Sequence, residues 1–176
     1  MKLGVLVYLE HRGRVLMIHR RKEDEHKGYW LAPGGKLDKN EAPLETACRE
    51  FHEETGLKIS GISLKALLSF PDYGDSPFGD EWQVFVFHAD EFAGEQLKNC
   101  PEGQLEWISL EKLSSLPMWE GDRLFTPRVF KPGFFMAKLE YRLNRLKKTV
   151  FWEAEGPGSL SGEYPSSGTN VLKVKY

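Results

Sequence analysis

The sequence has little of what defines several special classes of protein. It contains only two cysteines, Cys48 and Cys100, in 176 residues. This is too few for a disulfide framework, and the pair lacks the spacing of a zinc site. No apolar run is long enough to cross a membrane, and the first residues lack the long apolar segment and cleavage site of a secretory signal. We therefore expect a cytoplasmic protein with reduced thiols and no membrane partner.

The sequence also lacks an excess of charge of one sign. Its 24 Lys and Arg residues against 26 Asp and Glu residues give a formal net charge of -2. No block of like charge resembles a nucleic-acid-binding tail, so the composition disfavours a nucleic acid polymer as partner. A small anionic ligand is compatible with this balance if a bound cation supplies local positive charge. The length suits one globular domain, and nothing in the sequence indicates its oligomeric state.

The apolar pattern predicts one well-defined helix among several strands. The helix covers residues 43–55, with Pro43 suited to its first turn and Gly56 to the position just after its end. One buried helical stripe is predicted by the spacing of four apolar residues, Leu44, Ala47, Cys48 and Phe51. We expect a short helix at residues 110–116 and strands at residues 2–10, 15–19, within 57–70, 82–88 and 105–110.

The character of the chain changes after about residue 125, where Pro127 and Pro132 punctuate the sequence. Residues 136–143 alternate as a strand does, and residues 146–152 are the expected hairpin partner. The Gly-, Ser- and Pro-rich segment 153–170 predicts a long loop, followed by a last strand at 171–176. We therefore divide the chain into a domain over residues 1–125 and an extension over residues 126–176 that packs on the same domain.

Residues 35–57, GKLDKNEAPLETACREFHEETGL, carry the chemistry. On the predicted helix, Glu50, Glu53 and Glu54 stand at i, i+3 and i+4 and share one face, where like charges repel one another and oppose the helix dipole. A solvated acidic face is the simpler interpretation. A bound Mg²⁺ or Mn²⁺ would instead relieve the repulsion, because these ions prefer oxygen ligands and share their coordination with substrate phosphates. Such a metal site would suit hydrolysis of a phosphoanhydride.

The surrounding residues favour the metal site. The segment satisfies the pattern Gly-x5-Glu-x7-Arg-Glu-(apolar)-x-Glu-Glu-x-Gly-(apolar), which a chain matches by accident with a probability on the order of one in ten million. This pattern is the Nudix box, and the sequence resembles the Nudix hydrolase family at every position of it. The matching residues are Gly35, Glu41, Arg49, Glu50, Phe51, Glu53, Glu54, Gly56 and Leu57.

The resemblance implies an α/β fold, an α/β/α sandwich around a mixed β-sheet, to which the C-terminal hairpin would be an extension. It also implies a loop–helix–loop that binds Mg²⁺. Glu50, Glu53 and Glu54 would be metal ligands, one of them a candidate general base. Arg49 would orient this cluster, or else form an ordinary helix ion pair, and Glu41 would support the loop.

Three residues outside the box extend the resemblance to enzymes of the MutT type. The carbonyl of Gly34 would bind metal, and Lys36 would lie near phosphate or else be a solvated loop residue. Glu102 would be a further acidic ligand or base from another loop, with Glu106 as the alternative. The catalytic candidates are therefore Glu53, Glu50, Arg49 and Glu102, and the metal-ligand candidates are Gly34, Glu50, Glu53, Glu54 and Glu102.

The resemblance to MutT-type enzymes also suggests how a base is bound. Trp119 would stack on a purine while Asp122 hydrogen-bonds its edge, although a lone tryptophan is more often a core residue. Leu31 departs from the pattern, because such enzymes often carry a base-reading asparagine there. Arg20 or Arg21 would meet a phosphate or else lie on the surface.

The expected reaction is Mg²⁺-dependent attack of water on phosphorus in a nucleoside triphosphate, with (d)GTP or 8-oxo-dGTP as candidates, releasing a nucleoside monophosphate and pyrophosphate. The alternatives that the resemblance leaves open are dinucleoside polyphosphates, whose hydrolases often carry a tyrosine in the region of Tyr73, ADP-ribose, whose hydrolases carry a proline near Pro71, and nucleotide sugars. A non-catalytic nucleotide sensor is the alternative of another class, which the intact acidic positions of the box disfavour.

Overall fold

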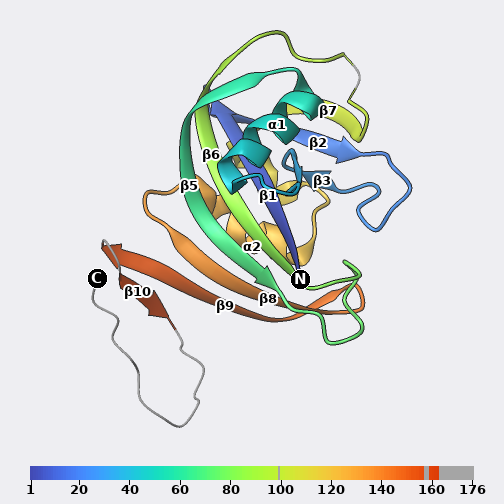
Figure 1. Cartoon of the computed structure of the whole chain (residues 1–176), viewed down its shortest axis with the longest axis vertical. Helices are drawn as coiled ribbons and strands as arrows, with labels where there is room; N and C mark the ends of the chain where they lie inside the picture. The colour runs from blue at the N-terminus through green and yellow to red at the C-terminus, as the bar shows by residue number, and fades with distance from the viewer. Residues whose placement is uncertain (99, 157–158, 163–176) are drawn as a thin grey trace.

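A computed structural model describes residues 1–98, 100–156 and 159–162. Its strands form one mixed sheet in the order β10-β9-β8-β5-β6-β1-β2-β3, with β4 paired to β1 and β7 paired to β2 (Figure 1). The β1–β6 and β5–β8 pairs are parallel, whereas the other pairs are antiparallel. The strands are β1 (Lys2–His11), β2 (Arg14–Arg20), β3 (Trp30–Leu31), β4 (Gly34–Lys36), β5 (Lys58–Phe70), β6 (Trp82–Ala93), β7 (Gly103–Ser109), β8 (Phe135–Arg142), β9 (Arg145–Gly156) and β10 (Ser159–Gly162).

Helix α1 (Pro43–Thr55) covers one face of this sheet and has the predicted bounds. Its Ala47 and Phe51 are fully buried against the apolar side chains that β1 presents to that face. The predicted stripe is wrong in two of its four members, because Leu44 and Cys48 are exposed. The helix is rotated so that Glu54 shares the buried face with Phe51, which brings an acidic side chain towards the interior.

Helix α2 (Glu120–Val129) lies on the opposite face and was not predicted. The sequence suggested a break at Pro127, since proline removes a backbone donor and crowds the preceding turn. That expectation is wrong: Pro127 lies inside the helix, which buries Phe125 and Val129 in the apolar core on that face of the sheet, together with Tyr141. Burial of these apolar side chains outweighs the local cost of the proline. The predicted short helix is the 3₁₀ segment Leu110–Ser115.

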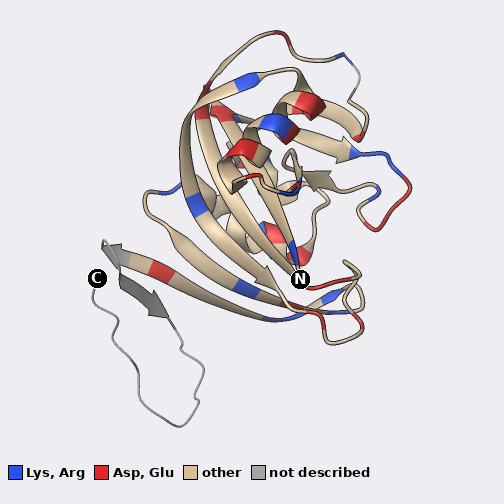
Figure 2. Ribbon diagram, viewed as in Figure 1, with Lys and Arg blue, Asp and Glu red and all other residues tan. Residues whose placement is uncertain are grey.

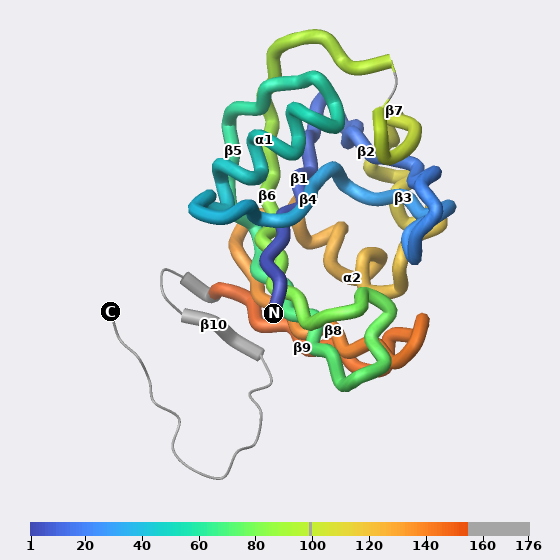
Figure 3. The backbone as a smooth tube through the Cα atoms, turned by 45° about the vertical axis from the view of Figure 1, so that its right-hand side comes forward, coloured from blue at the N-terminus to red at the C-terminus, as the bar shows by residue number. Residues whose placement is uncertain are grey.

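The C-terminal hairpin continues the main sheet, as the backbone tube in Figure 3 shows. Strand β8 pairs with β5 in parallel, starting at Ala66 and Phe135, and then with β9. The loop expected over residues 153–170 is wrong at its beginning, because β9 extends to Gly156 and β10 pairs with it. The last strand expected at 171–176 lies outside the described residues. Within the described chain, no helix has the length and apolar character needed to span a membrane.

Candidate functional site

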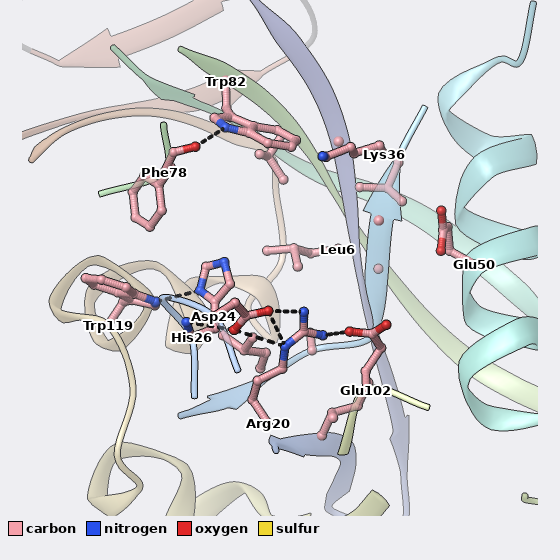
Figure 4. A pocket seen from close by; sticks show the side chains of 18 of the residues that line it. Leu6, Arg20, Asp24, His26, Lys36, Glu50, Phe78, Trp82, Glu102 and Trp119 are labelled. Carbon is pink, nitrogen blue, oxygen red and sulfur yellow. Dashed lines mark hydrogen bonds and ion pairs between the residues drawn. The ribbon is translucent and has the colours of Figure 1, made fainter. Parts of the chain in front are cut away.

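A cavity of about 590 Å³ lies between α1, the beginning of α2 and the strands that they flank. Glu50 and Glu102 approach it from one side, and the rings of Phe78 and Trp119 from the other (Figure 4). We call the first group the acidic end, made of Glu50, Glu54 and Glu102, and the second the aromatic end, made of Phe78, Trp82 and Trp119. Figure 2 shows acidic and basic segments next to each other on α1.

Glu54 is the most buried carboxylate of the acidic end, with a relative exposure of 8%. Its Oε2 accepts a hydrogen bond from the backbone N–H of Gly34 at 2.9 Å. Burial raises the pKa of Glu54 to about 8, the nearby charges of Glu50 and Glu102 add to this, and the Gly34 hydrogen bond opposes it. Three carboxylates that face one cavity repel one another when ionised, so their chemistry fits a divalent cation.

Glu50 lies against the turn that enters the Nudix-like segment. A Cβ atom built on Gly35 would lie 2.3 Å from the Glu50 carboxyl carbon, and one on Gly34 would lie 2.0 Å from the carbonyl oxygen of Val5. Glycine at these two positions therefore lets β4 approach both the acid and β1. Across the described residues, no three acidic, histidine or cysteine side chains already converge on one point at ligand distance. The acids line a common cavity without forming a closed cage.

Glu53 does not belong to the acidic end in this structure. Its side chain is 58% exposed, does not line the cavity and lies 3.4 Å from Nη1 of Arg49. Glu50 and Glu54, which are four residues apart, share the face of α1 that lines the cavity, whereas Glu53 points away from it. The burial of Ala47 and Phe51 fixes this rotation of the helix. The expectation that three glutamates of the box crowd together is therefore not met.

Arg49 joins the loop of the box to its helix. Its Nε and Nη2 donate to the two carboxylate oxygens of Glu41 at 2.7 and 2.8 Å, and its Nη1 lies 3.0 Å from Glu50 Oε1. The hydrogen bond with Glu41 is the main reason why the pKa of Arg49 is raised, and its counterpart lowers the pKa of Glu41 to about 2. This geometry allows Arg49 to hold Glu50 in place and Glu41 to support the loop.

Glu102 is fixed at the cavity rim by cations. Arg20 forms ion pairs with both Glu102 and Asp24, and Lys22 Nζ lies 3.2 Å from Glu102 Oε1. The alternative acid, Glu106, is exposed on β7 and does not line the cavity. The structure therefore brings Glu102, and not Glu106, to the acidic end.

Of the two adjacent arginines, only Arg20 lines the cavity. The Arg21 guanidinium instead donates to Gln104, in a separate surface depression. Lys36 also lines the cavity, but its Nζ lies 5.4 Å from the ring centroid of Trp82 and so contacts the aromatic end. Figure 4 shows this ammonium group turned towards Trp82 and away from Glu50.

The aromatic end is built around Trp119, which has a relative exposure of 5%. Its ring centroid lies 5.1 Å from those of Tyr29 and Phe78, and its Nε1 donates to His26 Nδ1 at 2.8 Å. Asp122 lines the same end, and burial raises the pKa of its carboxyl group to about 7. Trp119 is thus both a core residue and part of the cavity wall.

Among the lining residues that no sequence motif indicates are three rings, those of His26, Phe78 and Trp82. His26 lies in a charged segment that resembles an exposed loop, and Phe78 in the connection between β5 and β6. Trp82 was assigned only to a strand. No local pattern indicates these positions, because it is the folding of distant segments that brings them to the cavity.

Comparison with known proteins identifies the family. The family model for the NUDIX domain matches residues 2–129, and the chain belongs to that family. An uncharacterized Nudix hydrolase, YvcI of Bacillus subtilis, is 32% identical over 114 residues, covering 65% of this chain and 70% of that protein. The oxidized purine nucleoside triphosphate hydrolase of Danio rerio is 28% identical over 141 residues, covering 80% and 87%.

Among solved structures, a MutT protein from Bacillus halodurans superposes with a TM-score of 0.76 at 30% identity, over 86% of this chain and 97% of that one. This likeness confirms the mixed α/β fold. The protein is a Nudix hydrolase with activity on nucleotide-like substrates, and hydrolases of this family generally use a divalent metal.

Proposed function

We propose that this hydrolase converts a nucleoside triphosphate and water into a nucleoside monophosphate and pyrophosphate, with Mg²⁺ as the cofactor. The observation that carries the proposal is the cavity, because one space joins an acidic end suited to a metal–phosphate group to an aromatic end suited to a base. The similarity to the oxidized purine nucleoside triphosphate hydrolase supports the same substrate class.

In this proposal, Glu50, Glu54 and Glu102 hold the cation together with the Gly34 carbonyl, and Mn²⁺ would suit the same ligands. When bound, the cation would withdraw charge from the phosphoryl oxygens and lower the pKa of the attacking water. Arg49 positions Glu50 through the 3.0 Å ion pair. Glu102 is the candidate acceptor of the water proton, because its carboxylate lines the same cavity as Glu50 and Glu54 and would lie within reach of a metal-bound water.

The phosphates would lie next to Arg20, which already lines the cavity beside Glu102, with Lys36 at the other wall. The base would enter the aromatic end, where Trp119 offers an apolar surface and Asp122 a hydrogen-bonding group. We propose a purine, with (d)GTP and 8-oxo-dGTP as the first candidates. Leu31 lines the cavity and supplies no hydrogen bond through its side chain.

A substrate panel tests the proposal on the full chain with MgCl₂. It comprises dGTP, 8-oxo-dGTP, dATP, dCTP, ADP-ribose, a nucleotide sugar and a dinucleoside polyphosphate, with products separated by chromatography. We expect the highest kcat/KM for a purine triphosphate, and monophosphate with pyrophosphate as products. A highest value for any of the last three substrates would overturn the proposal. Binding of nucleotides without turnover would identify a sensor instead.

Variants test the acidic end. Glu50→Gln and Glu54→Gln keep the shape of the side chain and remove its charge, so we expect kcat/KM to fall about 100-fold or more, in the range found when metal-site interactions are lost. Glu111→Gln changes an exposed glutamate that does not line the cavity and serves as the matched control. Glu53→Gln decides the role of the outward-facing glutamate, since activity equal to that of the parent would remove Glu53 from the mechanism.

A further inference from the structure

His26 has a fixed place in the cavity wall although it belongs to the connection between β2 and β3. Its backbone N–H donates to Asp24 Oδ1 at 3.0 Å, and Asp24 is held in turn by Arg20. Gly28 closes the same segment through a 2.9 Å hydrogen bond from its N–H to the carbonyl of Arg20. The imidazole is therefore held by the framework that also positions Glu102, and its side chain is 27% exposed.

The contact with Trp119 determines which imidazole nitrogen carries the proton. An indole N–H can only donate, so His26 Nδ1 must accept through a lone pair, and the 2.8 Å distance indicates a well-formed hydrogen bond. The neutral ring then carries its proton on Nε2. Burial lowers the pKa of His26 against the opposing effect of Glu25 and Asp24, which agrees with a neutral ring.

The Nε2–H group faces the cavity. Figure 4 shows the second ring nitrogen turned into the space between Leu6 and Phe78. The nearest acidic oxygen, Glu25 Oε1, lies 3.5 Å away, which is too long for a strong hydrogen bond. The donor is therefore available to a ligand, next to the aromatic wall formed by Phe78 and Trp119.

The Nε2–H donor of His26 and the carboxyl group of Asp122 are complementary to the edge of a 6-oxopurine. Guanine and hypoxanthine carry a carbonyl acceptor at C6 beside an N1–H donor, whereas adenine carries an amino donor at C6. We propose that His26 is a specificity-determining residue that donates from Nε2–H to the C6 carbonyl of a 6-oxopurine nucleotide. Asp122 accepts from N1–H of the same base, and Trp119 stacks on it. This inference rests on the proposed triphosphate hydrolysis and adds the chemistry of base selection.

Two substitutions separate the two nitrogens of His26. Asparagine places its amide near the position of Nδ1, so His26→Asn retains an acceptor for Trp119 and loses the donor that faces the ligand. Glutamine reaches the position of Nε2, so His26→Gln retains that donor. The assay compares kcat/KM for dITP and dATP, which differ in purine only at the 6-oxo edge. Lys27→Gln is the control, because Lys27 lies in the same connection, pairs with Glu23 and does not line the cavity.

We expect the parent and Lys27→Gln to prefer dITP over dATP. His26→Asn should reduce that ratio about tenfold, mainly through KM for dITP, as expected for one lost hydrogen bond. His26→Gln should keep the ratio within about threefold of the parent value. A role for His26 that is only structural would lower activity on both nucleotides equally and leave the ratio unchanged.

An unchanged ratio in His26→Asn, or a parent preference for dATP, overturns the role of His26 while triphosphate hydrolysis stands. Failure of the parent to cleave any nucleoside triphosphate overturns the proposed function itself, so the two failures are distinguishable. Circular dichroism establishes that each variant is folded. If His26→Asn does not fold, His26→Ala decides, because it removes the Nε2–H donor of the partly exposed imidazole and leaves Trp119 in place: a reduced ratio supports the proposal and an unchanged ratio overturns it.

Discussion

The substitution Gly35→Ala tests whether the position of the Glu50 carboxylate controls activity. The added Cβ would lie 2.3 Å from the carboxyl carbon of Glu50, whereas ordinary van der Waals contact begins at 3.4 Å. The two groups must therefore separate by about 1 Å. The nearest obstacle is the end of a flexible side chain, and Gly35 has no positive φ, so the Glu50 side chain can move while the strand stays in place.

A displacement of about 1 Å at a reacting centre can reduce the rate about 100-fold. We therefore expect Gly35→Ala to lower kcat/KM about 100-fold, equivalent to roughly 2.7 kcal/mol of transition-state stabilisation. The free energy of unfolding should change by less than about 1 kcal/mol. Gly34→Ala is the contrasting variant: its Cβ would meet the carbonyl oxygen of Val5 at 2.0 Å, so strand pairing and therefore stability should suffer.

The assay combines steady-state kinetics with urea denaturation and is repeated in a Glu50→Gln background. If Gly35→Ala acts through Glu50, its effect on kcat/KM should largely disappear in the Glu50→Gln background, because that protein has already lost the contribution of the Glu50 charge. An equal loss in both backgrounds would refute the reasoning, as would a Gly35→Ala protein with parental activity.

Three further predictions concern groups around the cavity. Glu41→Gln removes the carboxylate bound by Arg49, whose stabilisation is present above pH 4.5 and lost as the pH falls towards 2, because the pKa of Glu41 is lowered to about 2. The Tm of the variant should therefore lie below that of the parent at pH 7 and close to it at pH 2. Asp122→Asn should gain stability relative to the parent as the pH rises from about 4 to 7, because the folded-state pKa of Asp122 is raised to about 7 and its stabilising protonated form is lost across that range. A difference in unfolding free energy between variant and parent that is the same at pH 5 and pH 8 would contradict this. Tyr141→Phe should cost about 1–3 kcal/mol in denaturant unfolding, because it leaves the buried N–H of Gly121 without its 2.7 Å acceptor.

The parts that were predicted correctly from sequence are those in which local pattern and motif coincide. Helix α1 has a regular apolar spacing, a proline at its start and a glycine after its end, and it was predicted with its bounds. The same pattern did not distinguish Glu53 from Glu54. Which of them faces the cavity depends on how Phe51 packs against β1, and this is a property of the tertiary structure.

Helix α2 and the aromatic end show the opposite case. Pro127 is an unfavourable local signal, and only the burial of Phe125 and Val129 under the sheet explains why the helix continues through it. His26 and Phe78 come from connections far apart in the sequence and meet at Trp119. Their role depends on contacts between segments, for which a single sequence contains no periodic signal.

The strand that follows the family-matched region also contributes to the aromatic end. The first backbone N–H groups of a helix have no partner within the helix. At the start of α2, the N–H of Gly121 donates to the Tyr141 hydroxyl on β8, at 2.7 Å. Since Trp119 and Asp122 flank this hydrogen bond in the chain and line the cavity, β8 holds the helix end that carries them. The NUDIX match ends at residue 129, yet the base-binding side of the proposed site depends on a hydroxyl group that lies beyond it.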